Sequence, residues 1–237
     1  MGTRVSPRTA ALVPAYEAAA SIAAVVRGTL AVLPAVVVVD DGSGDDTAVR
    51  AAAAGAEVLR HPINQGKGAA LVTGLRHLAT AGIERALTLD ADGQHLPDQI
   101  AVLLEASDAA PGAIVVGVRR KERFAIKRAA RFGNWIADHL MRGIAGRPLP
   151  DTQSGFRVYP VAATLALGTR GTRYDFETEV LLRAARAGMA VQGVPVEVYY
   201  PPVADRVSHY RPWADTLRII RSVLRVLVAR APASVSR

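Results

Sequence analysis

The chain has no cysteine among its 237 residues. This absence excludes disulfide bonds, thiolate metal sites and a cysteine nucleophile, and it is compatible with a reducing compartment such as the cytosol. We expect no secretory leader, because residues 1–8 are polar and the apolar run after them contains Pro14, Tyr16 and Glu17. No membrane-spanning helix is expected either, so any attachment to a membrane is expected to be peripheral.

Apolar residues make up 50% of the chain, enough for the core of one large α/β domain. The expected strands are 9–13, 35–40, 56–59, 86–90 and 113–119, and the helices between them are 18–31, 45–54, 67–81 and 97–107. This alternation predicts a Rossmann-like, mostly parallel central sheet flanked by helices, with ligands beyond the carboxyl ends of the strands. The second half is less regular, with a basic helix near 122–144, a loop at 151–157, a helix near 175–187 and a strand near 191–199.

Carboxylates follow the fourth of these strands. Asp90 and Asp92 are one residue apart, so the alternation of strand side chains places both on one side, where they can share a divalent cation. Mg²⁺ and Mn²⁺ prefer oxygen ligands and keep room for substrate phosphates, which suggests a nucleotide diphosphate as the ligand. An Asp pair at this place also caps helices or forms turns, so the pair alone leaves both explanations open.

Two further motifs stand at the end of the second strand and at the start of the third helix. Asp40 and Asp41 close an apolar run and lead through a Gly-Ser turn towards a helix, as in a parallel strand that opens into a ligand crevice. Lys67 lies between two glycines at the start of another helix, where close backbone approach and positive charge suit an anionic ligand. Together the motifs predict one crevice built from several strand ends.

The net charge of +8 is concentrated late in the chain. One basic cluster comprises Arg119, Arg120, Lys121, Arg123, Lys127, Arg128 and Arg131, and a second comprises Arg211, Arg218, Arg221, Arg225 and Arg230. Such clusters attract the phosphates of nucleic acids, nucleotides or lipids, but a solvated helix face has the same pattern.

Five motifs in order carry a resemblance to a known family. They are Val-Pro-Ala-Tyr-Glu at 13–17, Asp-Asp-Gly-Ser at 40–43, Asn-Gln-Gly-Lys-Gly at 64–68, Asp-Ala-Asp-Gly-Gln-His at 90–95 and Asp-Thr-Gln-Ser-Gly-Phe-Arg at 151–157. With them the chain resembles the family 2 glycosyltransferases of the GT-A fold, close to the polyprenol-phosphate (dolichol-phosphate) mannosyl- and glucosyltransferases. The resemblance implies a nucleotide-sugar donor, Mg²⁺ or Mn²⁺, and inversion at the anomeric carbon.

The resemblance also implies roles for individual residues. Asp90, Asp92 and Gln94 would surround the metal. The nucleotide-sugar would contact Pro14, Tyr16, Glu17, Asp40, Asp41, Lys67 and Asp90. Family members commonly have Tyr-Asn-Glu where this chain has Tyr-Glu-Ala at 16–18, so Glu17 departs from the family pattern.

A second group of residues is implied for the acceptor and for catalysis. Arg119 occupies a Gly-x-Arg position, and the acceptor phosphate would be held by Arg119, Lys127, Arg128 and Arg131. The expected catalytic residues are Asp92, Asp151 and Arg119, with the metal and Lys67 or a nearby Arg stabilising the departing diphosphate. Asp151 acts as a base or as an orienting group, and related sequences suggest that Glu177 faces the active site.

The C-terminal part, residues 201–237, is expected to form a basic amphipathic helix or tail after a GT-A domain at 1–200. Apolar residues repeat at helical spacing beside a basic stripe, namely Leu217, Ile220, Leu224 and Leu227 beside Arg218, Arg221 and Arg225. This pattern suits an anionic membrane surface, but a helix packed on the domain or on a second subunit has it too. The expected location is cytoplasmic, peripheral at the inner face of the plasma membrane, and the oligomeric state is left open.

The predicted function is transfer of a hexose from a GDP-mannose or UDP-glucose type donor to a polyprenyl phosphate. One alternative is transfer to a hydroxyl of another lipid or of a soluble acceptor. The other is a non-catalytic basic module that binds nucleotides or nucleic acid. We expect no nucleic acid partner, because several carboxylates in one crevice repel a polyanion unless a metal intervenes.

Overall fold

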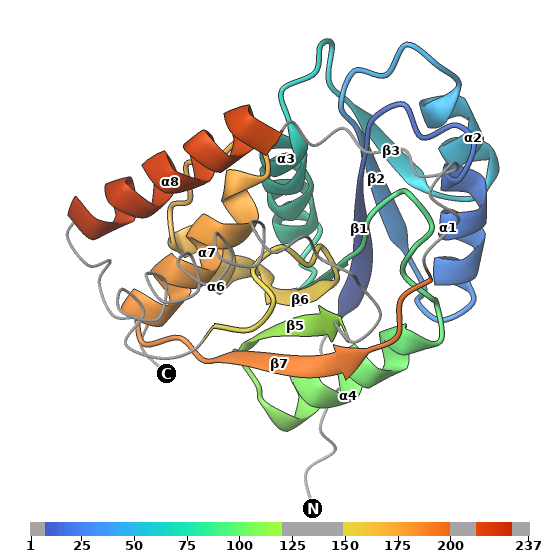
Figure 1. Cartoon of the computed structure of the whole chain (residues 1–237). Coiled ribbons are helices and arrows are strands. Elements are labelled where there is room, and N and C mark those ends of the chain that lie inside the picture. Colours follow the sequence, from blue (N-terminus) through green and yellow to red (C-terminus); the bar gives the residue numbers. More distant parts are fainter. Residues whose placement is uncertain (1–7, 120–148, 200–211, 229–237) are drawn as a thin grey trace, which may run out of the picture.

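The apolar runs of the sequence form one seven-stranded sheet in a computed structural model, which describes residues 8–119, 149–199 and 212–228 (Figure 1). The strand order is β3-β2-β1-β4-β6-β5-β7. The strands are β1 (Thr9–Ala15), β2 (Val36–Asp40), β3 (Glu57–Arg60), β4 (Arg85–Thr88), β5 (Ile114–Arg119), β6 (Arg157–Pro160) and β7 (Val191–Val196). β6 is antiparallel to β4 and β5, and the other pairs of described strands are parallel, so the predicted mostly parallel sheet is confirmed.

Helices cover both faces of the sheet. They are α1 (Ile22–Leu30), α2 (Thr47–Ala53), α3 (Lys67–Thr80), α4 (Gln99–Ala109), α6 (Val161–Ala166), α7 (Asp175–Arg186) and α8 (Pro212–Val228). One core layer joins the sheet to α3, α6 and α7, and a second joins it to α1 and α4. In β1, Leu12 packs in the first layer and its neighbours Ala11 and Val13 in the second. Burial of both faces explains why this strand is apolar without alternation.

Three differences from the predicted elements bear on the site. β4 ends at Thr88, so Asp90 and Asp92 lie in the loop beyond the strand rather than on it. β6 and α6 were not predicted, because a four-residue strand with an arginine and a proline has no alternating apolar pattern. The expected basic helix at 122–144 lies outside the described residues.

The last helix, α8, lies along the outer side of α7 (Figure 1). The Ser222 hydroxyl donates to Asp175 Oδ2 at 2.8 Å, and Val226 packs on Leu182. Its other side leaves apolar side chains exposed, namely Ile220, Leu224, Leu227 and Val228. One face of the predicted amphipathic helix therefore packs on the domain. None of the helices in the described ranges has the length and apolarity that crossing a bilayer requires.

Candidate functional site

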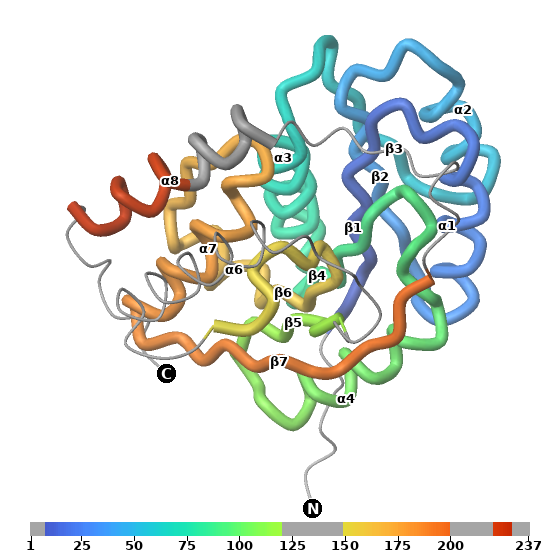
Figure 2. The backbone as a smooth tube through the Cα atoms, viewed as in Figure 1, coloured from blue at the N-terminus to red at the C-terminus, as the bar shows by residue number. Residues whose placement is uncertain are grey.

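The candidate site lies where the carboxyl ends of β1, β2 and β4 meet. β1 pairs in parallel with both neighbours, and its last residue, Ala15, lies beside Asp40 of β2. The loops after β1, β2 and β3 therefore leave the sheet at the same end (Figure 2). The backbone N–H of Glu17 donates to Ser43 Oγ at 2.8 Å, which fastens the first two loops together. Motifs that are far apart in the sequence thus form one rim.

Asp41 organises this rim from inside the protein. Its side chain is buried and lies 2.7 Å from His61 Nδ1. It also accepts hydrogen bonds from the backbone N–H groups of Gln65 and Gly66, at 2.9 and 2.7 Å. Asp41 therefore ties the end of β2 to the turn that precedes Lys67. Its predicted contact with the nucleotide stays a prediction.

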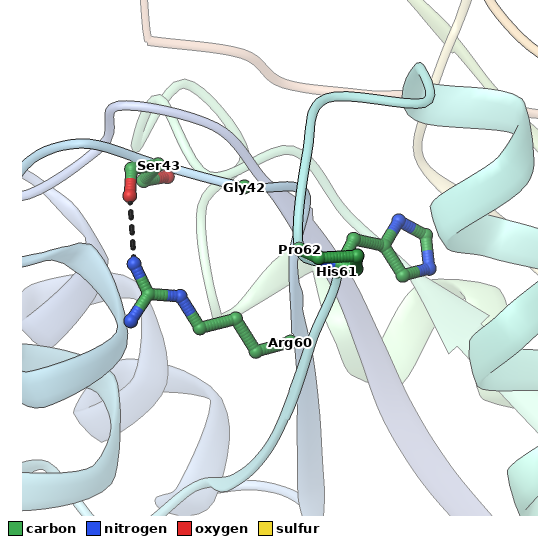
Figure 3. Close-up of a pocket in the computed structure, with 5 residues that line it drawn as sticks. All are labelled: Gly42, Ser43, Arg60, His61 and Pro62. Carbon is green, nitrogen blue, oxygen red and sulfur yellow. Dashed lines mark hydrogen bonds between the residues drawn. The ribbon is translucent and has the colours of Figure 1, made fainter.

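An open depression lies between the loops after β2 and β3 (Figure 3). It is lined by Gly42, Ser43, Arg60, His61 and Pro62. Arg60 crosses it and donates from Nη2 to the Ser43 carbonyl at 2.9 Å, and its Nε lies 3.2 Å from the buried Asp40 Oδ2. The side chain of Arg60 is 60% exposed, so one side of the depression carries a positive charge. Arg60 was not among the residues predicted from the sequence.

Lys67 stands at the centre of a charged cluster at the start of α3. Its Nζ lies 2.5 Å from Asp90 Oδ1 and 2.8 Å from Glu177 Oε1. Burial alone would lower the pKa of Lys67, but Asp90 and Glu177 outweigh it and hold this pKa well above the ordinary value of lysine. Burial likewise opposes ionisation of Asp90, yet Lys67 and His95 hold the pKa of Asp90 far below its usual range. Lys67 and Asp90 are therefore both charged near neutral pH.

The loop 151–157 borders the same cluster. Arg119 donates to Asp151 through two bonds, from Nε to Oδ2 at 2.7 Å and from Nη2 to Oδ1 at 3.0 Å. Gly155 approaches Asp90 so closely that a Cβ atom at this position would lie 2.5 Å from Asp90 Oδ1. The structure therefore brings Arg119, Asp151 and Asp90, all predicted site residues, onto neighbouring segments.

Arg157 holds the backbone of this loop. It is fully buried and donates to the carbonyl groups of Thr152, Ser154 and Glu177 at 2.9, 2.7 and 2.7 Å. A further bond reaches Tyr159 Oη at 3.0 Å. The sequence motifs predicted no role for Arg157. The available signal was a single basic residue inside the apolar stretch Phe-Arg-Val-Tyr, which argues against an ordinary surface position.

Asp92 and Gln94 lie on the turn beyond Asp90. Asp92 is exposed, and the Gln94 N–H donates to Asp92 Oδ1 at 3.0 Å. Partial desolvation and the negative charge of Asp90 raise the pKa of Asp92. In the part of the chain that the structure describes, no three His, Cys, Asp or Glu side chains are grouped to hold a metal by themselves. Two mutually repelling carboxylates at an open turn fit a cation such as Mg²⁺ or Mn²⁺ that takes its other ligands from phosphate and water.

Several other residues were predicted to contact the donor or the acceptor. Lys127, Arg128 and Arg131 lie outside the described residues. Pro14 is buried within β1, and Tyr16 is half-buried just beyond it. Their predicted roles at the acceptor phosphate and at the nucleotide stay predictions.

Glu17 adopts a left-handed backbone conformation, with φ of 49°. Residues other than Gly, Asn and Asp rarely adopt it, because Cβ crowds the backbone. We expect Glu17→Asn to raise the free energy of unfolding by about 0.5–1 kcal/mol, measured by urea denaturation. Glu17→Gln removes the charge without relieving the backbone and is expected to change stability by less than about 0.5 kcal/mol. An equal gain in both variants would contradict the backbone explanation.

Comparison with known proteins gives this site a chemical context. The model of Glycosyl transferase family 2 matches residues 10–166. An undecaprenyl-phosphate mannosyltransferase from Micrococcus luteus is 30% identical over 172 residues, or 68% of this chain and 70% of that protein. A UDP-N-acetylglucosamine–dolichyl-phosphate N-acetylglucosaminyltransferase from Methanococcus voltae is 31% identical over 147 residues, or 60% of this chain and 59% of that protein.

Solved structures share the fold. Glucosyl-3-phosphoglycerate synthase from Mycobacterium tuberculosis, in complex with Mn²⁺, UDP and phosphoglyceric acid, superimposes with a TM-score of 0.69 at 22% identity, covering 96% of this chain and 79% of that chain. The second alternative from the sequence, a non-catalytic basic module that binds nucleotides or nucleic acid, disagrees with the matches to glycosyltransferases. Because the family model covers more than half of the chain and the sheet has the GT-A architecture, the chain belongs to glycosyltransferase family 2.

Proposed function

We propose that this glycosyltransferase moves a hexose from a nucleotide-sugar, of the GDP-mannose or UDP-glucose type, to a polyprenyl phosphate with inversion at the anomeric carbon. The observation that carries the proposal is the pair Asp90 and Asp92 beside the charged Lys67, at the end of the sheet where the motif loops converge. The names of two relatives, which specify lipid-phosphate acceptors, support the choice of acceptor.

A divalent cation, Mg²⁺ or Mn²⁺, is part of the proposal. Asp92 and Asp90 would hold it, with Gln94 beside them on the same turn. When bound, the cation neutralises the negative charge that grows on the departing diphosphate. The presence of Mn²⁺ and UDP in a solved protein of the same fold supports this part of the proposal.

The nucleoside of the donor is proposed to lie along the rim formed by the loops after β1 and β2. Tyr16 offers a half-buried ring at the exit of β1, and Arg60 offers exposed donors in the neighbouring depression. Asp40 and Asp41 are buried beneath this rim, where they hold the backbone in place. The rim therefore combines a flat apolar surface with hydrogen-bond donors, which suits a base and ribose.

The acceptor determines how much proton transfer the site must perform. A phosphate monoester, with a second pKa of about 6, is already anionic near neutral pH, so it attacks without a strong general base. Asp151 is held by both donor groups of Arg119, an arrangement that suits an orienting role better than that of a base. We propose that Arg119 contacts the acceptor phosphate with the help of Lys127, Arg128 and Arg131.

A transfer assay tests the proposal. Purified protein is incubated with Mn²⁺, radiolabelled GDP-mannose or UDP-glucose, and undecaprenyl or dolichyl phosphate. We expect label in the organic extract that mild acid releases, because a glycosyl phosphate linkage hydrolyses readily. Extractable label that resists mild acid would instead indicate a hydroxyl acceptor. A lack of extractable label with every common donor would refute the polyprenyl-phosphate acceptor.

We also propose that the C-terminal unit, residues 201–237, brings the domain to an anionic membrane surface on the cytoplasmic side. On α8, the side chains of Ile220, Leu224 and Leu227 are 49, 54 and 44% exposed, and Arg221 is exposed beside them. Exposed apolar residues next to arginine match a surface of acyl chains and negative headgroups. Such contact would place the site near a lipid-borne acceptor.

Binding of the protein to lipid vesicles tests the proposed contact between α8 and the membrane surface. Replacement of Leu224 and Leu227 together by serine is expected to weaken binding to vesicles containing phosphatidylglycerol by about tenfold, because two apolar side chains lose their burial in lipid. Val49→Ser changes a side chain on α2 that is 68% exposed, and is expected to bind as wild type does. Equal binding of the double variant and wild type would contradict the docking of α8.

A further inference from the structure

Lys67 forms an ion pair with Asp90, one of the two carboxylates proposed to hold the cation. Its Nζ lies 2.5 Å from Asp90 Oδ1, while Asp90 Oδ2 is 3.5 Å from His95 Nε2. The backbone at Gly155 crowds the whole carboxylate, since an added Cβ there would lie 2.5 Å from Asp90 Oδ1 and 2.7 Å from Oδ2. A cation that approaches this oxygen is repelled by the lysine ammonium beside it, so departure of the lysine favours binding of the cation.

We propose, on the basis of the proposed function, that Lys67 is a displaceable counter-ion of Asp90 that moves to the donor's diphosphate when cation and nucleotide bind. Lys67 is then more than a fixed phosphate ligand. It makes the binding of the cation depend on the binding of the nucleotide.

The surroundings of Lys67 allow this exchange while limiting it to the side chain. The adjoining glycines are packed against the turn that precedes α7: a Cβ on Gly66 would collide with the Thr172 carbonyl oxygen, and one on Gly68 would lie 2.7 Å from the Gly171 carbonyl oxygen. The backbone at Lys67 is therefore held in place. Its four-carbon side chain is the part that can swing.

Glu177 supplies the second anchor for the exchange. Its side chain is 5% exposed and lies 2.8 Å from Lys67 Nζ. The backbone carbonyl of Glu177 accepts a bond from the buried Arg157, which holds this part of α7 in place. Lys67 can thus release Asp90 and still keep one carboxylate partner.

The charges explain why cation and nucleotide would bind together. The ammonium group of Lys67 lies between the carboxylates of Asp90 and Glu177, at 2.5 and 2.8 Å. A cation alone adds positive charge beside this lysine and takes away one of its partners. A cation with the donor's diphosphate brings negative charge that offsets its own positive charge, and the diphosphate offers Lys67 a new partner. Each ligand then increases the affinity of the other by the same factor.

Binding of Mn²⁺ to the protein without nucleotide, followed by electron paramagnetic resonance, tests the exchange directly. We expect Lys67→Met to bind Mn²⁺ about tenfold more tightly than wild type, because Asp90 is released. Lys67→Arg keeps the positive charge and is expected to bind no more tightly than wild type. With saturating Mn²⁺, Lys67→Met is expected to bind GDP or UDP about tenfold more weakly, because the diphosphate loses a cationic partner. General damage to the site would weaken both ligands instead.

A second comparison keeps the test valid if Lys67→Met fails to fold. Lys67→Met leaves Asp90 and Glu177 without their partner, so the double variant K67M/E177Q is compared with E177Q, and the double variant is expected to bind Mn²⁺ more tightly. Mn²⁺ affinity that is unchanged or weaker in both comparisons would overturn the exchange. Failure of the proposed function is a separate result, because it would appear in the wild-type protein as a lack of nucleotide binding and of sugar transfer.

Discussion

Asp92→Asn is expected to lower the turnover of sugar transfer by about a thousandfold or more, because the variant loses the exposed carboxylate proposed to hold the cation at the diphosphate. The fold is expected to remain intact, since Asp92 makes its described hydrogen bond to the local N–H of Gln94. In the absence of cation, the midpoint of unfolding at neutral pH should equal or exceed that of wild type. The reason is that desolvation and the negative charge of Asp90 raise the pKa of Asp92, so the ionised side chain is unfavourable in the folded state.

A control variant tests whether the loss of turnover is specific to Asp92 or follows from the loss of any exposed carboxylate. Asp98→Asn removes one exposed carboxylate at the start of α4, where the side chain makes no capping hydrogen bond. Its turnover is expected to stay within about twofold of wild type. Initial rates at saturating donor and Mn²⁺, with a thermal melt of each protein, provide the measurement. A fully active Asp92→Asn protein would count heavily against the cation assignment.

Arg157→Met is expected to lower the free energy of unfolding by at least about 3 kcal/mol, because it leaves three buried acceptors and one partly buried acceptor without a donor. These are the carbonyl groups of Thr152, Ser154 and Glu177 and the hydroxyl of Tyr159. Sugar transfer should fall as well, since the loop that carries Asp151 and Gly155 loses its support. Urea denaturation and the transfer assay measure the two effects.

Two other variants calibrate this result. Arg76→Met replaces an exposed arginine on α3 and is expected to change stability by less than about 0.5 kcal/mol. Arg157→Lys keeps the charge but can satisfy fewer of the carbonyl groups, so its stability is expected to fall between wild type and Arg157→Met. If the free energy of unfolding of Arg157→Met lies within about 1 kcal/mol of the wild-type value, the loop does not depend on this guanidinium.

The position of the crevice could be predicted from the sequence because it follows from local patterns. Apolar runs that end in acids or glycines identify parallel strands and their carboxyl ends, and parallel strands present these ends together. By this reasoning Asp40 and Asp90 were expected at the carboxyl ends of neighbouring strands; in the structure Asp40 ends β2 and is buried, and Asp90 lies just beyond β4. The short strand β6 escaped the same reasoning, since its residues pair with β4 and β5 for reasons of tertiary packing rather than pattern.

The pairing of charges could not be predicted in this way. Each of the partnerships at the site joins residues from different segments, as between Lys67 and Glu177 or between Arg119 and Asp151. A carboxylate in a sequence gives no sign of which distant cation will meet it. The burial of Arg157 and the φ of Glu17 likewise depend on neighbours that the chain acquires on folding.

The order of apolar runs and their polar ends, by itself, determined that this protein builds an α/β sheet with acids at one edge, because side-chain periodicity and the direction of parallel strands are local properties of a chain. Only the tertiary structure decided that Lys67 neutralises Asp90, that Asp151 binds Arg119 and that one face of α8 stays uncovered. Electrostatic partners and exposed faces depend on distances of a few ångströms between segments that only folding brings together.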